Sequence, residues 1–406
     1  MGASMSQSLV RHIGSQGVLA RSALRLAAGR WIGRGLKIVL PGGRVIELGD
    51  GGDGESAVLR VNGYRALRRA LTGGDIGFAE GYLAGDWDTP DLARLLSALA
   101  VNFEALGPLG AGNPVHRLFQ FRLKLLQVNT LRGSRRNIHA HYDLGNAFYE
   151  AWLDPGMTYS GAMFAHADDT LETAQARKYA ALAQAIGLRR GHSVLEIGCG
   201  WGGFAEFAAR EFEARVTAVT ISPAQHAYAE ARIHRAGLAD RVEVRLCDYR
   251  HIAGRFDRVV SIEMFEAVGE RYWPTFFDVL RDRLAPGGRA GLQVITMRDD
   301  LFADYRRRVD FIQRYVFPGG MLPAERGLVQ AAGHAGLRCS EATRFGPDYA
   351  RTLQAWSGRF ERAWPQLRGA RFDERFGRLW RFYLAYCEAG FATGRTDLIQ
   401  LALDPA

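Results

Sequence analysis

The sequence predicts an α/β fold: a mostly parallel, seven-stranded sheet with helices on both faces, preceded by a smaller α+β domain. Two observations predict it. From about residue 170, helix-type and strand-type segments alternate, which is typical of a parallel sheet covered by helices. A strand, a glycine-rich turn and a helix start also follow one another at Val194–Gly203. The length of 406 residues allows more than one domain.

The first part of the chain predicts the smaller domain. Apolar residues alternate around the turn Pro41-Gly42-Gly43, and Thr89-Pro90-Asp91 has the form of a helix start. The expected strands are 36–40, 45–48 and 57–61, and the expected helices are 64–71 and 90–105. We divide the chain into a basic segment (1–35), a small α+β domain (36–110), a basic amphipathic linker helix (111–136) and a larger α/β domain (137–406).

The larger domain, 137–406, contains the predicted seven-stranded sheet. Its strands are expected at 193–198, 215–221, 241–247, 256–262 and 288–296, with closing strands at 337–344 and 396–403. Its helices are expected at 170–187, 202–212, 223–236 and 271–284, with helical additions at 298–315 and 348–390.

Charge and composition narrow the function classes. The net charge is +9, and residues 1–46 and 105–142 contain no acidic residue. Such stretches attract a polyanion, either nucleic acid or an anionic membrane, although a solvated basic face is the plain alternative. The first stretch also has the Arg-rich, acid-poor composition of a transit peptide. No apolar run reaches the roughly 18 residues that a membrane span needs. The four cysteines are widely spaced and predict neither a disulfide framework nor a metal site.

The glycine-rich turn predicts a cofactor that carries an amino acid. Gly198, Gly200 and Gly202 let the backbone approach a ligand closely. Glu196 precedes the first glycine by two residues, and its carboxylate can pair with an ammonium group. No further glycine stands where a dinucleotide fingerprint would place its third. This pattern favours S-adenosylmethionine (SAM) over a dinucleotide.

The ends of the next two strands extend the cofactor site. Thr220 replaces the acidic residue that often binds a ribose at such a strand end, and Gln225 is within reach of it. Asp248 can bond an adenine amino group while the ring of Tyr249 packs on the adenine face. Three such signals on successive strand ends predict a SAM-dependent methyltransferase.

Several longer motifs resemble one known family. They are His139–Asn146, Met157–Ser160, Leu195–Gly202, Met264–Gly269, Phe317–Pro323 and Phe345–Tyr349. From about residue 137 to 403 the chain resembles the cyclopropane-fatty-acid synthases and their mycolic-acid relatives. The resemblance implies a SAM-dependent methyltransferase fold and methylation of a cis double bond in an acyl chain of a membrane phospholipid, followed by closure of a cyclopropane ring.

The resemblance also implies that 36–110 is associated with lipid or substrate and that 137–406 is a catalytic domain with helical lid insertions. It further implies roles for particular residues. Tyr159 and Ser160 would contact the methionine end of SAM, with Gly198 and Gly200 beneath the cofactor. Thr220 and Gln225 would hold the ribose, and Tyr249 would cover the adenine. In the family a bicarbonate ion takes the final proton, and a Cys, a Glu, a His and a Tyr hold it.

The chain departs from the family at this bicarbonate site. Glu266 and Tyr349 match the Glu and the Tyr, but Gly161 stands at the Cys position and Gln293 at the His position. Gln donates a hydrogen bond but cannot act as a base, so the substitutions count against bicarbonate. Glu263 is an extra acid, and strand alternation would place it on the face of Ser261 and Phe265. We hypothesise that Glu263 or Glu266 takes the proton directly, or that both bind another anion or water. The alternative is a purely structural Glu263.

Aromatic faces stabilise a carbocation without capturing it. The candidates, each of which could equally be an ordinary core residue, are Phe265, Tyr272, Trp273, Phe311, Tyr315, Phe317 and Tyr349. The altered base site leaves the product open among a cyclopropane, a methyl- or methylene-branched chain and a furan precursor. Two other functions also remain: a methyltransferase for a small molecule or nucleic acid, and a SAM- or lipid-binding protein without cyclopropanation.

We expect a cytoplasmic enzyme associated peripherally with the inner face of the membrane. Its expected partners are an unsaturated phospholipid substrate and an anionic membrane surface, and we expect no nucleic acid, since no Asn-Pro-Pro-Tyr-type motif for base amines is present. A homodimer is an open option, and the double bond and head group are not specified by the sequence.

Overall fold

The computed structural model describes residues 31–49, 55–103 and 144–406. It divides into two units, which are treated separately. The described parts of the first are 31–49, 55–103 and 368–393, and those of the second are 144–367 and 394–406. The predicted linker helix, the basic segment up to residue 30 and the motif residues His139 to Asp143 lie outside the described residues.

In its described residues, the first unit contains a four-stranded sheet and three helices. Its strands are β1 (Leu36–Val39), β2 (Val45–Leu48), β3 (Ala57–Val61) and β4 (Trp87–Asp88), in the order β2-β1-β3-β4. Its helices are α3 (Arg65–Leu83), α4 (Leu92–Val101) and α18 (Glu374–Ala392). The first three strands and α4 were predicted. The helix predicted at 64–71 continues to Leu83 across a break at Gly74, which has φ 59°.

Helix α18 differs from the predicted domain boundaries. The sequence placed 348–390 with the catalytic domain, but residues 368–393 group with the first unit. The reason is aromatic packing, because the Phe382 ring lies 5.8 Å from that of Tyr82 and 6.5 Å from that of Trp87. The small domain is therefore completed by a segment close to the C-terminus.

The second unit has the predicted seven-stranded sheet, in the order β10-β11-β9-β8-β5-β6-β7. Its strands are β5 (Ser193–Ile197), β6 (Arg215–Thr220), β7 (Val242–Leu246), β8 (Phe256–Ile262), β9 (Leu284–Met297), β10 (Leu337–Arg344) and β11 (Thr396–Pro405). Strands β5 to β9 pair in parallel, whereas β11 pairs antiparallel with both β9 and β10. The predicted mostly parallel sheet is confirmed.

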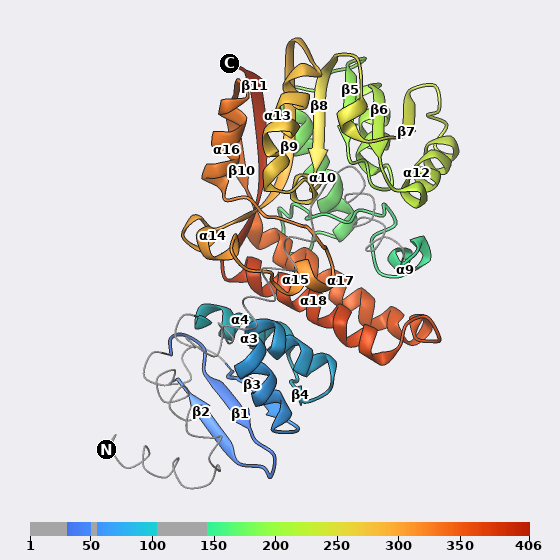
Figure 1. Ribbon diagram of the computed structural model, residues 1–406. Coiled ribbons are helices and arrows are strands. Elements are labelled where there is room, and N and C mark those ends of the chain that lie inside the picture. The colour runs from blue at the N-terminus through green and yellow to red at the C-terminus, as the bar shows by residue number, and fades with distance from the viewer. Residues whose placement is uncertain (1–30, 50–54, 104–143) are drawn as a thin grey trace. The chain divides into compact units, whose positions relative to one another are not determined.

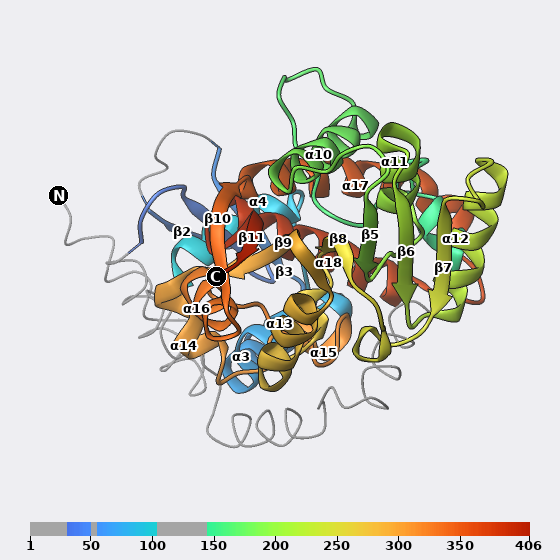
Figure 2. The ribbon, with the colours of Figure 1, turned by 90° about the horizontal axis from the view of Figure 1, so that it is seen from above.

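Helices cover both faces of this sheet (Figures 1 and 2). On one face, α10 (Leu171–Ala185), α11 (Gly203–Phe212) and α12 (Pro223–Arg235) pack on a core that includes Leu182 and Val194. On the other, α13 (Trp273–Asp282) and α16 (Glu325–His334) pack on a core that includes Phe276 and Leu292. The other helices are α9 (Asn146–Glu150), α14 (Asp299–Tyr305), α15 (Phe311–Tyr315) and α17 (Gly346–Leu367).

Candidate active site

The glycine-rich turn lies between β5 and α11, at the carboxyl end of a central strand. Gly198, Gly200 and Gly202 have φ values of 83°, 52° and 83°, a region that only glycine adopts readily. A Cβ on Gly198 would lie 2.5 Å from Cγ of Met264, whereas one on Gly200 would meet nothing within 4 Å. The backbone at Gly200 is therefore open to a ligand, as the sequence predicted for a cofactor loop.

Glu196 lies directly beneath this turn and is buried. Burial raises the pKa of its carboxyl to about 8, while the charges of Arg232 and Lys178 act in the opposite direction. Among the described residues, its Oε2 atom has no hydrogen-bond partner. A buried acceptor without a partner fits a ligand that brings an ammonium group. The residues of this turn thus fit SAM.

The ends of β6 and β7 hold the other residues predicted to bind the cofactor. Thr220 Oγ1 donates to Oε1 of Gln225 at 3.0 Å, so these two side chains lie together after β6. The carboxylate of Asp248 accepts from Nε and Nη2 of Arg250 at 2.8 and 2.7 Å. Sequence reasoning missed this arginine, which pairs with the carboxylate predicted to bond an adenine. Tyr249 packs edge-on against Phe276, with ring centroids 5.6 Å apart.

Two side chains of α10 hold Ser160. Lys178 Nζ donates to Oγ of Ser160 at 2.5 Å, and Gln175 Nε2 donates to its backbone oxygen at 2.8 Å. Lys178 is fully buried, which lowers the pKa of its ammonium group to about 8. The carboxylates of Glu263, Asp154 and Glu196 oppose that shift. The sequence analysis did not identify Gln175 or Lys178.

The carboxylate of Glu263 lies at the centre of the site. Its Oε1 accepts from the backbone N–H of Gly161 at 2.8 Å and from Nε2 of Gln293 at 2.7 Å. Its Oε2 accepts from the hydroxyl of Tyr349 at 2.7 Å. Three of the residues singled out from the sequence therefore meet at one carboxylate. Glu266, the other candidate base, has a different hydrogen-bond partner, the backbone N–H of Ile295.

The backbone explains how Glu263 reaches these donors. Strand β8 ends at Ile262, and Glu263 follows with φ 49°, in the left-handed region that non-glycine residues rarely adopt. The prediction that strand alternation continues through Ser261 to Phe265 was therefore wrong, because the chain leaves the strand before Glu263 and Phe265 lies in a short 3₁₀ turn. The Glu263 N–H donates to the backbone oxygen of Gln293 at 2.8 Å.

A second set of amides fixes the orientation of Gln293. Gln400 on β11 donates from Nε2 to Oε1 of Gln293 at 3.0 Å and to the backbone oxygen of Lys178 at 3.0 Å. With its oxygen engaged, Gln293 presents its NH₂ group to Glu263 and to the backbone oxygen of Gly161, at 2.7 and 3.3 Å. Gln293 is thus fixed as a donor, which suits a carboxylate acceptor.

Glu266 has different surroundings from Glu263. Its Oε1 accepts from the backbone N–H of Ile295 at 2.5 Å. Its Oε2 is buried and has no hydrogen-bond partner within the described part of the chain. Burial and the nearby charge of Glu263 raise the pKa of Glu266 to about 8. At neutral pH Glu266 is therefore mainly a neutral acid. Burial also raises the pKa of Glu263, but the charge of Lys178 and the three hydrogen-bond donors act in the opposite direction and stabilise its charged form.

Aromatic rings surround the loop that carries Ser160. The Tyr159 ring lies 5.4 Å from that of Trp356 and 6.5 Å from that of Phe317, and the Tyr349 ring lies 5.9 Å from that of Trp356. Phe265 and Trp273 instead stack on each other in the core, with centroids 5.4 Å apart. Trp356 was missed from the sequence because its position on the amphipathic helix α17 resembles that of any core residue.

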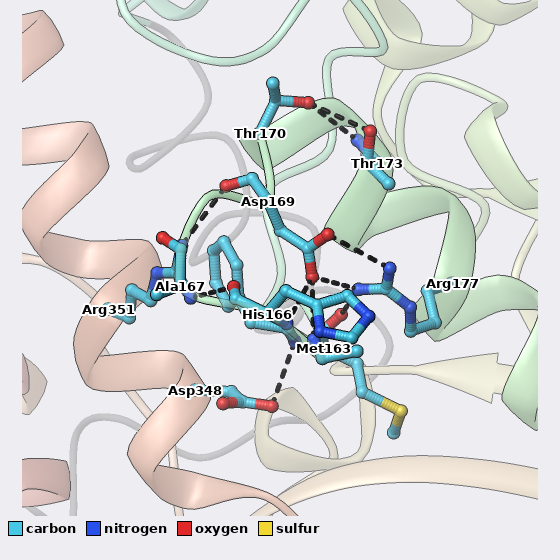
Figure 3. Close-up of polar contacts among 11 residues, drawn as sticks. Met163, His166, Ala167, Asp169, Thr170, Thr173, Arg177, Asp348 and Arg351 are labelled. Carbon is cyan, nitrogen blue, oxygen red and sulfur yellow. Dashed lines mark hydrogen bonds and ion pairs between the residues drawn. The ribbon is translucent and has the colours of Figure 1, made fainter.

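The loop after Gly161 is fastened to α17 and α10 (Figure 3). Asp169 accepts from the N–H groups of Ala165 and His166 at 2.7 and 2.9 Å and from Arg177 at 2.6 Å. Arg351 on α17 donates to the backbone oxygens of His166 and Ala167 at 2.7 and 2.5 Å. The same helix carries Tyr349, so these contacts hold Tyr349 and Gly161 in a fixed relation.

Known proteins resemble this chain over most of its length. A family model for mycolic acid cyclopropane synthetase matches residues 129–401. The chain is 41% identical over 346 residues to the tuberculostearic acid methyltransferase UfaA1 of Mycobacterium tuberculosis, covering 83% of this chain and 80% of that protein. It is 34% identical over 351 residues to the cyclopropane-fatty-acyl-phospholipid synthase of Escherichia coli, covering 85% of this chain and 87% of that one.

Solved structures give the same result. The mycolic acid cyclopropane synthase CmaA1, complexed with SAH and CTAB, superposes with a TM-score of 0.62 at 29% identity, covering 66% of this chain and 97% of that one. The cyclopropane synthase MmaA2 from Mycobacterium tuberculosis has the same TM-score, identity and coverage. The resemblance identified from the sequence motifs is confirmed.

Proposed function

Because the chain belongs to the mycolic acid cyclopropane synthetase family, we propose that it methylates the double bond of an unsaturated fatty acyl chain in a phospholipid. It is a SAM-dependent methyltransferase with the fold of that family. The observation that carries the proposal is the Glu263 carboxylate, buried beside Ser160–Gly161 at the carboxyl end of β8. Ligands of open α/β sheets bind at this end of the strands.

The residues around the turn are proposed to hold the cofactor. Glu196 would receive the ammonium group, Gly200 would lie against the cofactor, and Tyr159 and Ser160 would contact its methionine end. On the far side, the ribose and adenine would be held by Thr220, Gln225, Asp248 and Tyr249, with Gly198 and Gly202 shaping the turn. When bound, SAM supplies an electrophilic methyl group on a sulfonium. Lys178 orients the Ser160 hydroxyl, and burial excludes water.

The remaining chemistry concerns one proton. The π electrons of the alkene would form a C–C bond to the methyl carbon while the methyl–sulfur bond breaks and the sulfur leaves as a neutral thioether, which would leave positive charge on the other alkene carbon. Tyr349, Tyr159 and Trp356 present aromatic faces in this region. A base must then remove a proton. Glu263 suits this task better than Glu266, because its three donors favour the carboxylate, whereas Glu266 is mainly protonated near neutral pH.

A second product class is favoured by one comparison. The protein named as a tuberculostearic acid methyltransferase is 41% identical to this chain, against 34% for the named cyclopropane-fatty-acyl-phospholipid synthase. Removal of the proton from the new methyl group closes a cyclopropane. Removal from a neighbouring carbon yields an alkene with a methyl branch, and a hydride shift before proton loss gives a methylene branch. A methyl- or methylene-branched product on the same scaffold is therefore the second candidate.

The location and the binding partners of the enzyme belong to the same proposal. We expect the enzyme to bind peripherally to an anionic membrane on the cytoplasmic side. We expect no nucleic acid partner, and a homodimer is one option for its assembly. The acid-free stretches that would contact the membrane lie mainly outside the described residues. Within the described ranges, no helix is both long enough and apolar enough to cross a membrane.

The test of this function uses purified full-length protein. It is incubated with methyl-labelled SAM and vesicles of an unsaturated anionic phospholipid, and the extracted lipid is analysed by mass spectrometry. Label in the acyl chain is the expected result. Label only in the head group, or none in lipid despite measurable SAM binding, would contradict the proposal. Vesicles of the matching saturated phospholipid are the control and should remain unlabelled.

A further inference from the structure

The Glu263 carboxylate fills a site that three separate segments build for an anion. The backbone N–H of Gly161, Nε2 of Gln293 and the Tyr349 hydroxyl converge on it at 2.8, 2.7 and 2.7 Å. The buried ammonium group of Lys178 adds an attractive charge. Three donors and one cation around one carboxylate are the surroundings in which a small buried anion is stable.

A separate bicarbonate ion does not fit this arrangement. Each of the three donors is already bonded to Glu263. There is also no room at the position of the family's cysteine, because a Cβ on Gly161 would lie 2.4 Å from Cδ2 of Leu398 and 2.9 Å from Cδ1 of Tyr349. The close approach of Tyr349 to Glu263 thus depends on glycine at position 161.

The backbone of Glu263 indicates that its carboxylate serves a function. A glutamate at φ 49° is strained, whereas glycine would adopt that conformation freely. Strain of this kind persists where the surroundings fix it, and it gathers at active sites. Here the carboxylate at the end of the strained residue makes all three of the hydrogen bonds described above.

We propose that Glu263 is a built-in replacement for bicarbonate, so that the reaction needs no exchangeable anion. This inference rests on the proposed methyl transfer to an acyl double bond. Either the new methyl group or a carbon next to the positive charge loses a proton to the Glu263 carboxylate. The electron pair of that C–H bond forms the C–C bond of the ring in the first case and a C=C bond in the second. Glu263 becomes a neutral acid, which later returns the proton to water.

The first test removes bicarbonate from the wild-type assay. Turnover of labelled SAM into acyl chains is measured in buffer purged of carbon dioxide, and again after sodium bicarbonate is added. The expected result is the same rate in both. A rate that collapses on purging and returns with bicarbonate would overturn this inference while leaving the methyltransferase function intact. Absence of labelled lipid under both conditions would instead count against the proposed function.

The second test empties the site with Glu263→Gly, which removes the carboxylate and suits the backbone conformation. Turnover should fall by about 10²-fold or more. Sodium formate or bicarbonate should restore part of it. The melting temperature of this variant should also rise with formate, whereas that of the wild type should not.

Glu263→Gln is the matched control, because its amide fills the site and should block rescue. A folded Glu263→Gly variant that keeps full turnover without added anion would overturn the inference. So would one that neither binds formate nor recovers activity with formate or bicarbonate.

Discussion

Glu263 and Glu266 stand three positions apart and are both buried, but their carboxyl groups have different neighbours. Glu263 accepts three hydrogen bonds and faces Lys178, which offsets part of the cost of burying its charge. Glu266 accepts from Ile295 on one oxygen, and the other has no partner in the described part of the chain. The distinction between base and neutral acid therefore rests on donors, since burial is common to both.

The pKa of Glu266 predicts how stability depends on pH. Its folded-state pKa is about 8 and its ordinary value is 4.5. Between these values the folded state binds a proton that the unfolded state has lost, so Glu266 reduces stability as pH rises through this window. Glu266→Gln is neutral throughout. Its melting temperature relative to wild type should rise between pH 5 and pH 8, and a difference independent of pH would contradict this assignment.

Gly161 is predicted to tolerate no side chain. The Cβ of Gly161→Ala would overlap Leu398 and push the Tyr349 ring away from Glu263. We expect a loss of about 1–3 kcal/mol in the free energy of unfolding, measured by chemical denaturation, together with a lower kcat. The control is Gly327→Ala on α16, where a Cβ would meet nothing within 4 Å and helix propensity favours alanine. Equal effects of the two variants would contradict the crowding argument.

At the scale of elements, helix α17 carries Tyr349 and contacts the loop 163–170. Arg351 donates to three backbone oxygens of this loop, those of His166, Ala167 and Asp169. It also lies over the Phe164 ring, with its guanidinium carbon 4.0 Å from the ring centroid. Asp348, on the same turn, accepts from the N–H of Phe164 at 3.0 Å. Hydrogen bonds and a cation–π contact therefore join the loop to the helix.

Arg351→Ala should free this loop. We expect a loss of about 1–3 kcal/mol in the free energy of unfolding and faster amide hydrogen exchange across residues 163–170, because three backbone oxygens lose their donor. Arg362→Ala is the control, since Arg362 is exposed farther along the same helix. Unchanged exchange in the loop of the Arg351 variant would show that its contacts do not order it.

Sequence patterns predicted the sheet well because strand ends and glycine turns are local signals. All seven strands of the second unit were expected, and so were four of the helices that cover it. Helix α16 was missed, and the break at Gly74 inside α3 could not be placed, because tertiary packing decides there over local preference.

The site was predictable only in part. Glu263, Gln293 and Tyr349 were identified, but their convergence depends on a left-handed residue after β8 that no alternation rule includes. Lys178 was missed because a lysine on a helix normally lies in water. Its full burial is a property of the folded structure alone.

At the scale of the whole molecule, helix α18 follows most of the second unit in the sequence but belongs to the first unit. Arg378 on α18 stacks on the Tyr82 ring, with its guanidinium carbon 3.9 Å from the centroid, and donates to the backbone oxygens of Tyr82 and Trp87 at 2.5 and 3.1 Å. The first unit is therefore formed from segments nearly 300 residues apart in the sequence.

Arg378→Ala should weaken the first unit selectively. The loss of one cation–π contact and of two hydrogen bonds to backbone oxygens predicts about 1–3 kcal/mol of local destabilisation. Hydrogen exchange should become faster in α3 and β4 while the strands around Glu263 keep their protection. Arg375→Ala, on the exposed side of the same helix, is the control. Equal loss of protection in both units would contradict the assignment of α18 to the first.

The most direct test of the central claim is to feed methyl-deuterated methionine to cells that express the wild type, Glu263→Gln or Glu341→Gln. Glu341 is an exposed residue of β10 and serves as the control. Mass spectrometry of the fatty acids should show acyl chains that gain a deuterated methyl carbon in the wild type and in Glu341→Gln. The gain should fall by about 10²-fold or more in Glu263→Gln. Equal labelling in all three would contradict a catalytic role for Glu263, and no labelled acyl chain in the wild type would contradict methyl transfer to these lipids.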